Sequence, residues 1–247
     1  MRLNESTIYI GCAGWSLGRE HWPAFPAEGT HLQRYAARFN CVEINSSFYR
    51  PHRRQTYERW ADSVAPDFRF AVKVPKLITH EQRLAVSAAA LDEFLGQCQG
   101  LADRLGCLLV QLPPKLAFDA PVAEAFFHAL RERFTGSVVL EPRHESWTEA
   151  EAMLMELQIA QAVVDPSRIS TDTAPGGWQG LQYWRLHGSP RIYHSAYEAA
   201  YLQQLAQNLR RAKADGRDIW CIFDNTASGA ATADALALRA LIEGGER

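Results

Sequence analysis

Eight short runs of strand-forming residues alternate with segments of helical spacing, and this alternation most constrains how the 247-residue chain can fold. Strands that alternate with helices predict a parallel sheet, because each helix returns the chain to the edge where the next strand begins. Eight such units predict a closed (β/α)8 TIM barrel rather than an open sheet. The runs cover residues 8–11, 41–45, 70–74, 108–112, 138–141, 162–165, 183–187 and 219–223.

The segments between these runs have apolar residues at helical intervals. Leu91, Phe94, Leu95 and Cys98 form one such stripe. Gly106, Gly136 and Gly216 each follow a segment of this kind, where a helix needs a C-terminal stop. Further helices are predicted at 122–134, 149–157, 198–214 and 230–242, with a short one at 55–65 and either a weak helix or a turn after Asp165.

The length and composition indicate one globular domain over residues 1–247. With 47% hydrophobic residues the chain can bury a large core, and a barrel fills this length as one domain. No Pro-, Ser- or Gly-rich stretch is long enough to be a linker. An open, doubly wound sheet is the competing fold, but residues 11–15 lack the third glycine of a dinucleotide-binding loop and lead into a loop instead of a helix.

The chain has no overall positive charge, so a nucleic acid or membrane could be bound only by a local basic patch. The chain has 26 Lys and Arg against 28 Asp and Glu, for a net charge of -2. Its five cysteines are scattered, with no metal-binding spacing, which fits a reducing environment. We also find no signal peptide and no apolar run of membrane-spanning length. We therefore expect a cytoplasmic protein without a membrane partner. The sequence does not determine its oligomeric state.

Alternation along the strands places polar side chains on the inner face. In residues 42–45, Val42 and Ile44 suit the helix-facing side, so Glu43 and Asn45 point inward. The eighth run allows either Asp224 or Asn225 on the inner face. Applied to the remaining runs, the same rule sends inward Lys73, Gln111, Glu141, Arg143, Val163, Asp165, Arg185 and His187.

In each strand the apolar inward residue comes first and the ionisable one last. Active sites of β/α barrels lie at the carboxyl ends of the strands, so this order predicts a functional site there. The alternative is a buried ion network with a purely structural role, since charged groups are rarely buried unpaired. Both interpretations remain open for any single residue.

Several polar and aromatic segments recur in one known family. They are 11–16, 42–45, 47–49, 67–73, 78–80, 111–113, 141–147, 183–188 and 223–225. In these segments the sequence resembles the YecE-like family, a domain-of-unknown-function family. The resemblance covers nearly the whole chain and implies a TIM barrel, but no reaction. Similar sequences usually read Phe-Asn-Asn at Phe223-Asp224-Asn225, so this chain lacks an amide donor at Asp224.

The first functional hypothesis is an enzyme that uses acid/base chemistry on a small anionic substrate, phosphorylated or carboxylated. The reaction class (hydrolase, isomerase or lyase) is open. Guanidinium and ammonium groups bind anions, and buried Glu and His side chains can work as a general base and acid. The predicted catalytic residues are Glu141, His187, Asp165 and Glu43. The predicted substrate-binding residues are Lys73, Arg143, Arg185, Asn45, Gln111, His80, Asn225 and the aromatic Tyr49 and Trp147.

The second hypothesis is a metal-dependent phosphoester hydrolase similar to endonuclease-IV-like barrels. Its ligands would be Glu43, Glu141, Asp165, His187 and Asp224. Lys73, Arg143 and Arg185 would compete with a metal ion for these carboxylates. We therefore expect no cofactor, and a divalent metal ion is the alternative expectation.

The third hypothesis is binding without catalysis, toward nucleic acid or another ligand. A local basic and aromatic patch follows the second strand and could contact phosphates and stack a base. Its residues are Tyr49, Arg50, His52, Arg53, Arg54 and Tyr57.

Overall fold

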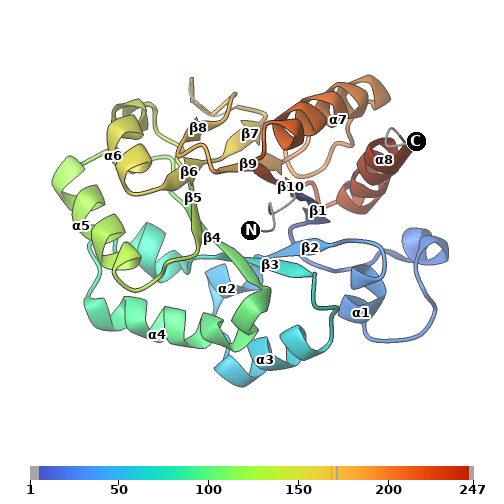
Figure 1. Cartoon of the computed structure of the whole chain (residues 1–247), viewed down its shortest axis with the longest axis horizontal. Coiled ribbons are helices and arrows are strands. Elements are labelled where there is room, and N and C mark those ends of the chain that lie inside the picture. Colours follow the sequence, from blue (N-terminus) through green and yellow to red (C-terminus); the bar gives the residue numbers. More distant parts are fainter. Residues whose placement is uncertain (1–5, 168, 171, 245–247) are drawn as a thin grey trace.

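The computed structural model describes residues 6–167, 169–170 and 172–244, and its strands form two hydrogen-bonded sheets (Figure 1). All neighbouring strands are parallel except β6 and β8, which are antiparallel. The four-stranded sheet has the order β1 (Ile8–Cys12), β10 (Asp218–Phe223), β9 (Leu181–Leu186) and β7 (Val163–Asp165). The six-stranded sheet has the order β2 (Cys41–Ile44), β3 (Arg69–Lys73), β4 (Leu105–Gln111), β5 (Ser137–Glu141), β6 (Ile159–Gln161) and β8 (Gly176–Gly177).

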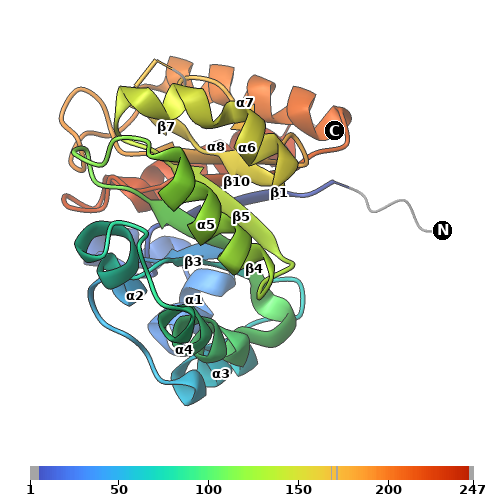
Figure 2. The same cartoon turned by 90° about the vertical axis from the view of Figure 1, so that its left-hand side faces the viewer.

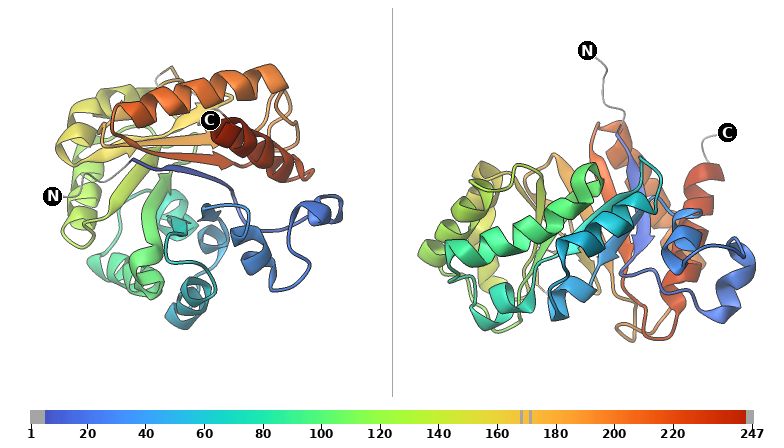
Figure 3. Two further views of the ribbon diagram at one scale, coloured as in Figure 1. Left: turned by 45° about the vertical axis from the view of Figure 1, so that its right-hand side comes forward. Right: turned by 90° about the horizontal axis from the view of Figure 1, so that it is seen from below.

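Most of the helices lie on the outside of the strands (Figures 1 and 2). Several begin at a polar cap, as at Thr30, Ser87 and Asp119, whose side chains accept hydrogen bonds from the first turn. Figure 3 shows the last helix beside β1, with which it is in contact. The helices are α1 (His31–Ala36), α2 (Ser46–Tyr49), α3 (Arg54–Asp62), α4 (Ala88–Cys98), α5 (Ala120–Arg131), α6 (Glu151–Glu156), α7 (Ala199–Ala214) and α8 (Ala230–Gly244).

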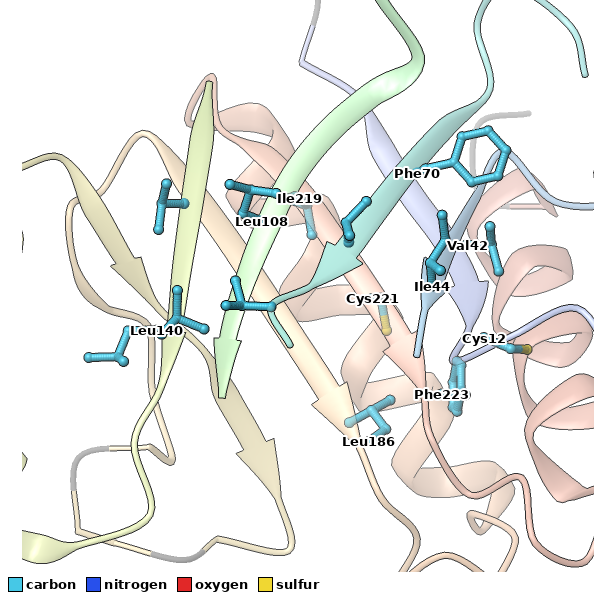
Figure 4. Packing of buried hydrophobic residues seen from close by; sticks show 14 of the residues in the cluster. Cys12, Val42, Ile44, Phe70, Leu108, Leu140, Leu186, Ile219, Cys221 and Phe223 are labelled. Atoms are coloured by element: carbon cyan, nitrogen blue, oxygen red, sulfur yellow. The ribbon is translucent and has the colours of Figure 1, made fainter. Parts of the chain in front are cut away.

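The strands separate two apolar layers, as the alternation of side chains requires. Val42, Ile44 and Phe70 belong to the larger layer between strands and helices (Figure 4). The second layer takes residues from both sheets, so the two sheets enclose it together. It comprises Cys41, Ala71, Cys107, Leu109, Val139, Ala160, Ala162, Val164, Leu181, Tyr183, Trp220 and Ile222.

The hydrogen-bonded strand order does not close into a ring. Within the described residues, β1 and β2 are joined by side chains instead of a strand ladder. Asn40 accepts a hydrogen bond from the Ile10 amide and donates one to the Ile8 carbonyl, both at 2.9 Å. The Tyr35 hydroxyl likewise accepts from Cys12 N at 2.7 Å and donates to Cys41 O at 3.0 Å. The structure is therefore an α/β fold with parallel sheets, and the closed barrel predicted from the sequence is not seen in its hydrogen bonding.

Two short strands stand where one was predicted at 162–165, because the prediction did not include residues 159–161. The segment 159–161 pairs with β5, whereas 163–165 pairs with β9, so the chain passes from one sheet to the other at Ala162. Of the weak helix and the turn predicted after Asp165, the described residues form turns, together with the short β8. The residue pattern does not indicate the change of sheet, because strand-forming Ile159, Val163 and Val164 lie on both sides of it.

Candidate functional site

A charged cluster lies at the carboxyl ends of the strands, and Arg185 of β9 is at its centre. The Arg185 guanidinium binds Glu43 with two hydrogen bonds, from Nε at 3.0 Å and from Nη2 at 2.7 Å. It also donates to Glu141 Oε2 at 2.6 Å and to Asp224 Oδ2 at 3.0 Å. Tyr183 adds a hydrogen bond to Glu43 Oε2 at 2.8 Å. Arg185, Glu43 and Glu141 are fully buried, so this part of the cluster is an ion network inside the fold.

Glu141, at the end of β5, links this buried network to the more exposed Arg143. Its Oε1 accepts from Gln111 Nε2 at 2.8 Å and from Arg143 Nε at 2.9 Å. Burial opposes the negative charge, but Arg185 and Arg143 outweigh it and hold the pKa of Glu141 well below its usual range. Arg143 Nη2 lies 2.8 Å from the same oxygen and forms an ion pair with it. The angle is unsuitable for a hydrogen bond, so the N–H groups of Nη2 have no acceptor among the described residues.

His187 lies between two carboxylates. Its Nδ1 is 2.9 Å from Asp224 Oδ2, and its Nε2 is 3.6 Å from Glu141 Oε1. Burial disfavours a charged imidazole, but the adjacent carboxylates of Asp224 and Glu141 prevail and raise the pKa of His187. Although burial also disfavours the Asp224 carboxylate, Arg185 and His187 keep the pKa of Asp224 below its usual value. The raised pKa favours the protonated imidazole.

Lys73, at the end of β3, is buried without an ion pair. Among the residues that the structure describes, no carboxylate lies within 4.0 Å of its amine. Instead, Lys73 Nζ lies 4.3 Å from the centre of the Phe48 ring. Burial, and next to it the charge of Arg185, lower the pKa of Lys73 to about 8.

His80 packs on the same Phe48 ring as Lys73. The two ring centres are 4.9 Å apart, and His80 Nδ1 is 2.8 Å from the Thr79 hydroxyl. Burial and the charges of Lys73 and Arg143 lower the pKa of His80. Asn45 is also in the cluster, and donates a long hydrogen bond of 3.4 Å to Asp224 Oδ1. The side-chain oxygen of Asn45, Oδ1, is buried without a hydrogen-bond partner among the described residues.

Asp165 does not face the cluster, and the predicted inner face of the sixth strand is wrong by one residue. Val164 lies in the inner apolar layer, so its neighbours Val163 and Asp165 point the other way. The Asp165 carboxylate accepts from the Tyr197 hydroxyl at 2.9 Å, on the side of α7. The sequence placed the strand correctly but could not decide its face, because valines occupy both sides.

Three further predicted site residues lie away from the charged cluster. Asn225 points toward α8 and donates to Ser195 O at 2.8 Å and to Asp234 Oδ2 at 2.7 Å, so only Asp224 of this pair faces inward. Trp147 is fully buried, donates to Leu116 O at 2.9 Å and supports the loop after β4. Tyr49 is 79% exposed and contacts Phe48 edge-on.

Sequence reasoning missed two aromatic members of the site. Tyr183 follows the alternation rule, and its hydroxyl could have been predicted beside Glu43 from the strand pattern. Tyr193 lies in the loop after β9, and its ring stands edge-on to His187 with 5.4 Å between centres. Its side chain also interacts with Arg143. No strand pattern predicts Tyr193, because a loop conformation with a positive φ of 69° places it.

The geometry bears on the other two hypotheses as well. Within the described residues, no three His, Cys, Asp or Glu side chains converge in a way that could hold a metal ion. In the basic patch after β2, Tyr57 is buried and Arg54 pairs with Glu58 at 3.0 Å. Tyr57 therefore cannot stack a base. No helix in the described part of the chain is long and apolar enough to cross a membrane.

The fold and the cluster together define an α/β protein whose parallel strands carry an ion network at their carboxyl ends. A family described as "Protein of unknown function DUF72" matches residues 9–247, and the chain belongs to this family. It is 34% identical to the UPF0759 protein YecE of Escherichia coli (strain K12) over 138 residues, which is 56% of this chain and 48% of that protein. The match thus spans about half the length of that relative. A second relative, the UPF0759 protein YunF of Bacillus subtilis (strain 168), is 23% identical, and the match covers 90% of each chain.

Two crystal structures of DUF72 family proteins have the same fold. The protein from Enterococcus faecalis V583 gives a TM-score of 0.80 at 20% identity, with 96% of each chain covered. The protein from Thermotoga maritima MSB8 gives a TM-score of 0.79 at 24% identity, with 96% of this chain and 99% of that chain covered. At these identities the likeness shows the fold alone. The comparisons therefore confirm the predicted family and leave the chemistry to be argued from the site.

Proposed function

We propose that this protein is an enzyme that uses acid/base chemistry on a small anionic substrate at the carboxyl ends of its strands. The observation that carries the proposal is a pair of cationic side chains at the edge of the cluster whose binding capacity is not filled. Among the described residues, the Lys73 amine has no carboxylate within 4.0 Å, and Arg143 Nη2 has no hydrogen-bond acceptor. A bound phosphate or carboxylate would supply the missing acceptor oxygens.

The roles within the proposed site follow from how fully each cation is paired. Arg185 has committed its guanidinium to three carboxylates, so it holds Glu43 and Glu141 in place more than it binds substrate. Arg143 and Lys73 are the better anion ligands, because an Arg143 nitrogen lacks an acceptor and the Lys73 amine lacks an ion pair. His187, held by Asp224, is positioned to give or take the proton.

We also propose that the two sheets form the wall of one (β/α)8 barrel. The shared inner layer and the side-chain bridges at Asn40 and Tyr35 support this arrangement. A Cβ added to Gly11 would come within 2.2 Å of the Cys41 carbonyl, so only glycine allows β1 to approach β2 so closely. Slow amide exchange along β1, comparable to that along β4, would support a closed wall, and rapid exchange of β1 alone would refute it.

Titration with inorganic phosphate and with small carboxylates, followed by calorimetry, tests the proposed binding site. We expect saturable binding that falls at least tenfold in Arg143→Met. The matched control is Arg54→Met on the exposed face of α3, which should bind as the unchanged protein does. Equal affinity in the two variants would contradict the proposal. Binding that instead requires added Mg²⁺, Mn²⁺ or Zn²⁺ would favour the metal-dependent hydrolase.

A further inference from the structure

The Lys73 amine is the least compensated charged group of the cluster. Its side chain is buried, yet among the described residues no carboxylate lies within 4.0 Å of its amine, and Nζ lies 4.3 Å from the centre of the Phe48 ring. Lys76, three residues further on, is half exposed and pairs with Glu81 at 3.2 Å. A buried lysine normally has a carboxylate partner, because desolvation of an ammonium ion is costly. The fold therefore keeps at Lys73 an amine that it does not use for its own stability.

The surroundings of Lys73 make its amine easier to deprotonate than that of a free lysine. Burial and the nearby Arg185 lower its pKa to about 8, so a substantial fraction is unprotonated in mildly alkaline solution. Desolvation beside another cation is a recognised way to make a lysine nucleophilic. Carboxylates at ion-pair distance would have reversed this effect, but Glu43 and Glu141 are engaged by Arg185.

We propose that Lys73 attacks the carbonyl group of a small anionic substrate and forms an imine. The inference rests on the proposed function, because Arg143 would hold the anionic end of the same molecule. The neutral nitrogen attacks the carbonyl carbon, a C–N bond forms, and the carbonyl π electrons move to oxygen. Both amine hydrogens pass to that oxygen, which leaves as water when the C–O bond breaks. A C=N bond to Lys73 remains, and water reverses the step.

Neighbouring groups suit the proton transfers of this step. His80 packs on the same Phe48 ring, and burial together with Lys73 and Arg143 lowers its pKa, so it is a neutral base near pH 7. His187 has a raised pKa and can supply a proton to the departing oxygen. The cluster thus offers an amine, a base and an acid among its side chains.

Reductive trapping tests this inference. The full chain is incubated with sodium cyanoborohydride and either pyruvate or dihydroxyacetone phosphate, and adducts are located by peptide mass spectrometry. The chain has four lysines, Lys73, Lys76, Lys115 and Lys213, so each can be followed separately. We expect one adduct, at Lys73, whose yield rises with pH around a midpoint near 8. The two probes distinguish a carboxylated from a phosphorylated carbonyl substrate.

Three controls make the result decisive. Lys76→Arg should leave trapping unchanged and Lys73→Arg should abolish it, while inorganic phosphate should compete with it. Adducts spread equally over the lysines, or no adduct at Lys73 with either probe, would overturn the inference. If phosphate still binds in an Arg143-dependent way in that case, the proposed anion site stands and only the imine step fails.

Discussion

The inner and outer parts of the charged cluster differ in how completely their charges are paired. The inner part, Glu43, Glu141 and Arg185, is fully buried and every carboxylate oxygen has a donor. In the outer part, the Lys73 amine has no ion pair and an Arg143 nitrogen has no acceptor. The two interpretations left open by the sequence therefore apply to different residues. The inner network has the features of scaffold, and the outer edge has those of a binding site.

The largest expected effect is on the inner network. Arg185→Met leaves Glu43 and Glu141 buried without their main counter-charge, so we expect a loss of about 3–5 kcal/mol in the free energy of unfolding, measured by urea denaturation. Arg54→Met, which removes an exposed pair on α3, should change it by less than about 1 kcal/mol. If the two variants are equally stable, the inner network is not scaffold.

The next largest effect on stability is expected at Asp224, which lies between the inner and outer parts of the cluster. Asp224→Asn removes a carboxylate that contacts Arg185 and His187, and we expect a loss of about 1–3 kcal/mol at neutral pH. Because folding lowers the pKa of Asp224, its contribution is present above its unfolded-state pKa and is lost as the pH falls through the folded value. The two proteins should therefore converge in stability in acid.

The same substitution should lower the pKa of His187, which the Asp224 contact helps to raise. An NMR titration of the His187 imidazole measures this shift. An unchanged titration would mean that Glu141 alone controls His187.

A smaller effect of opposite sign is expected at the outer edge. Lys73→Met replaces an unpaired buried amine by an apolar side chain and should stabilise the fold by about 1 kcal/mol at pH 7 while weakening phosphate binding. Folding lowers the pKa of Lys73 to about 8, so the unfolded chain binds more protons above that pH. The advantage of the methionine variant should shrink as the pH rises beyond 8. A clear loss of stability at pH 7 would show that Lys73 is scaffold.

The smallest effect is expected at Tyr49, outside both parts of the cluster. Its side chain is 79% exposed, so Tyr49→Ala should change the free energy of unfolding by no more than about 0.5 kcal/mol. Phosphate binding should also be unchanged. Weakened binding would extend the site outward over α2.

The sequence alone determined the order of strands and helices, and with it most of the inner polar set. Strand alternation correctly placed Glu43, Lys73, Gln111, Glu141, Arg185 and His187 on one face, because polar and apolar residues alternate clearly there. The same rule failed at Asp165, where Val163 and Val164 fit either face.

Only the tertiary structure decided which of these charges are paired. Pairing depends on the distances between strands that are far apart in sequence, as when Arg185 meets Glu43 and Glu141. The tertiary structure also shows that side chains join β1 to β2, and that the loop after β9 brings the Tyr193 ring against His187. Local patterns encode which face of a strand a residue occupies, but the partner it finds depends on how the whole chain packs.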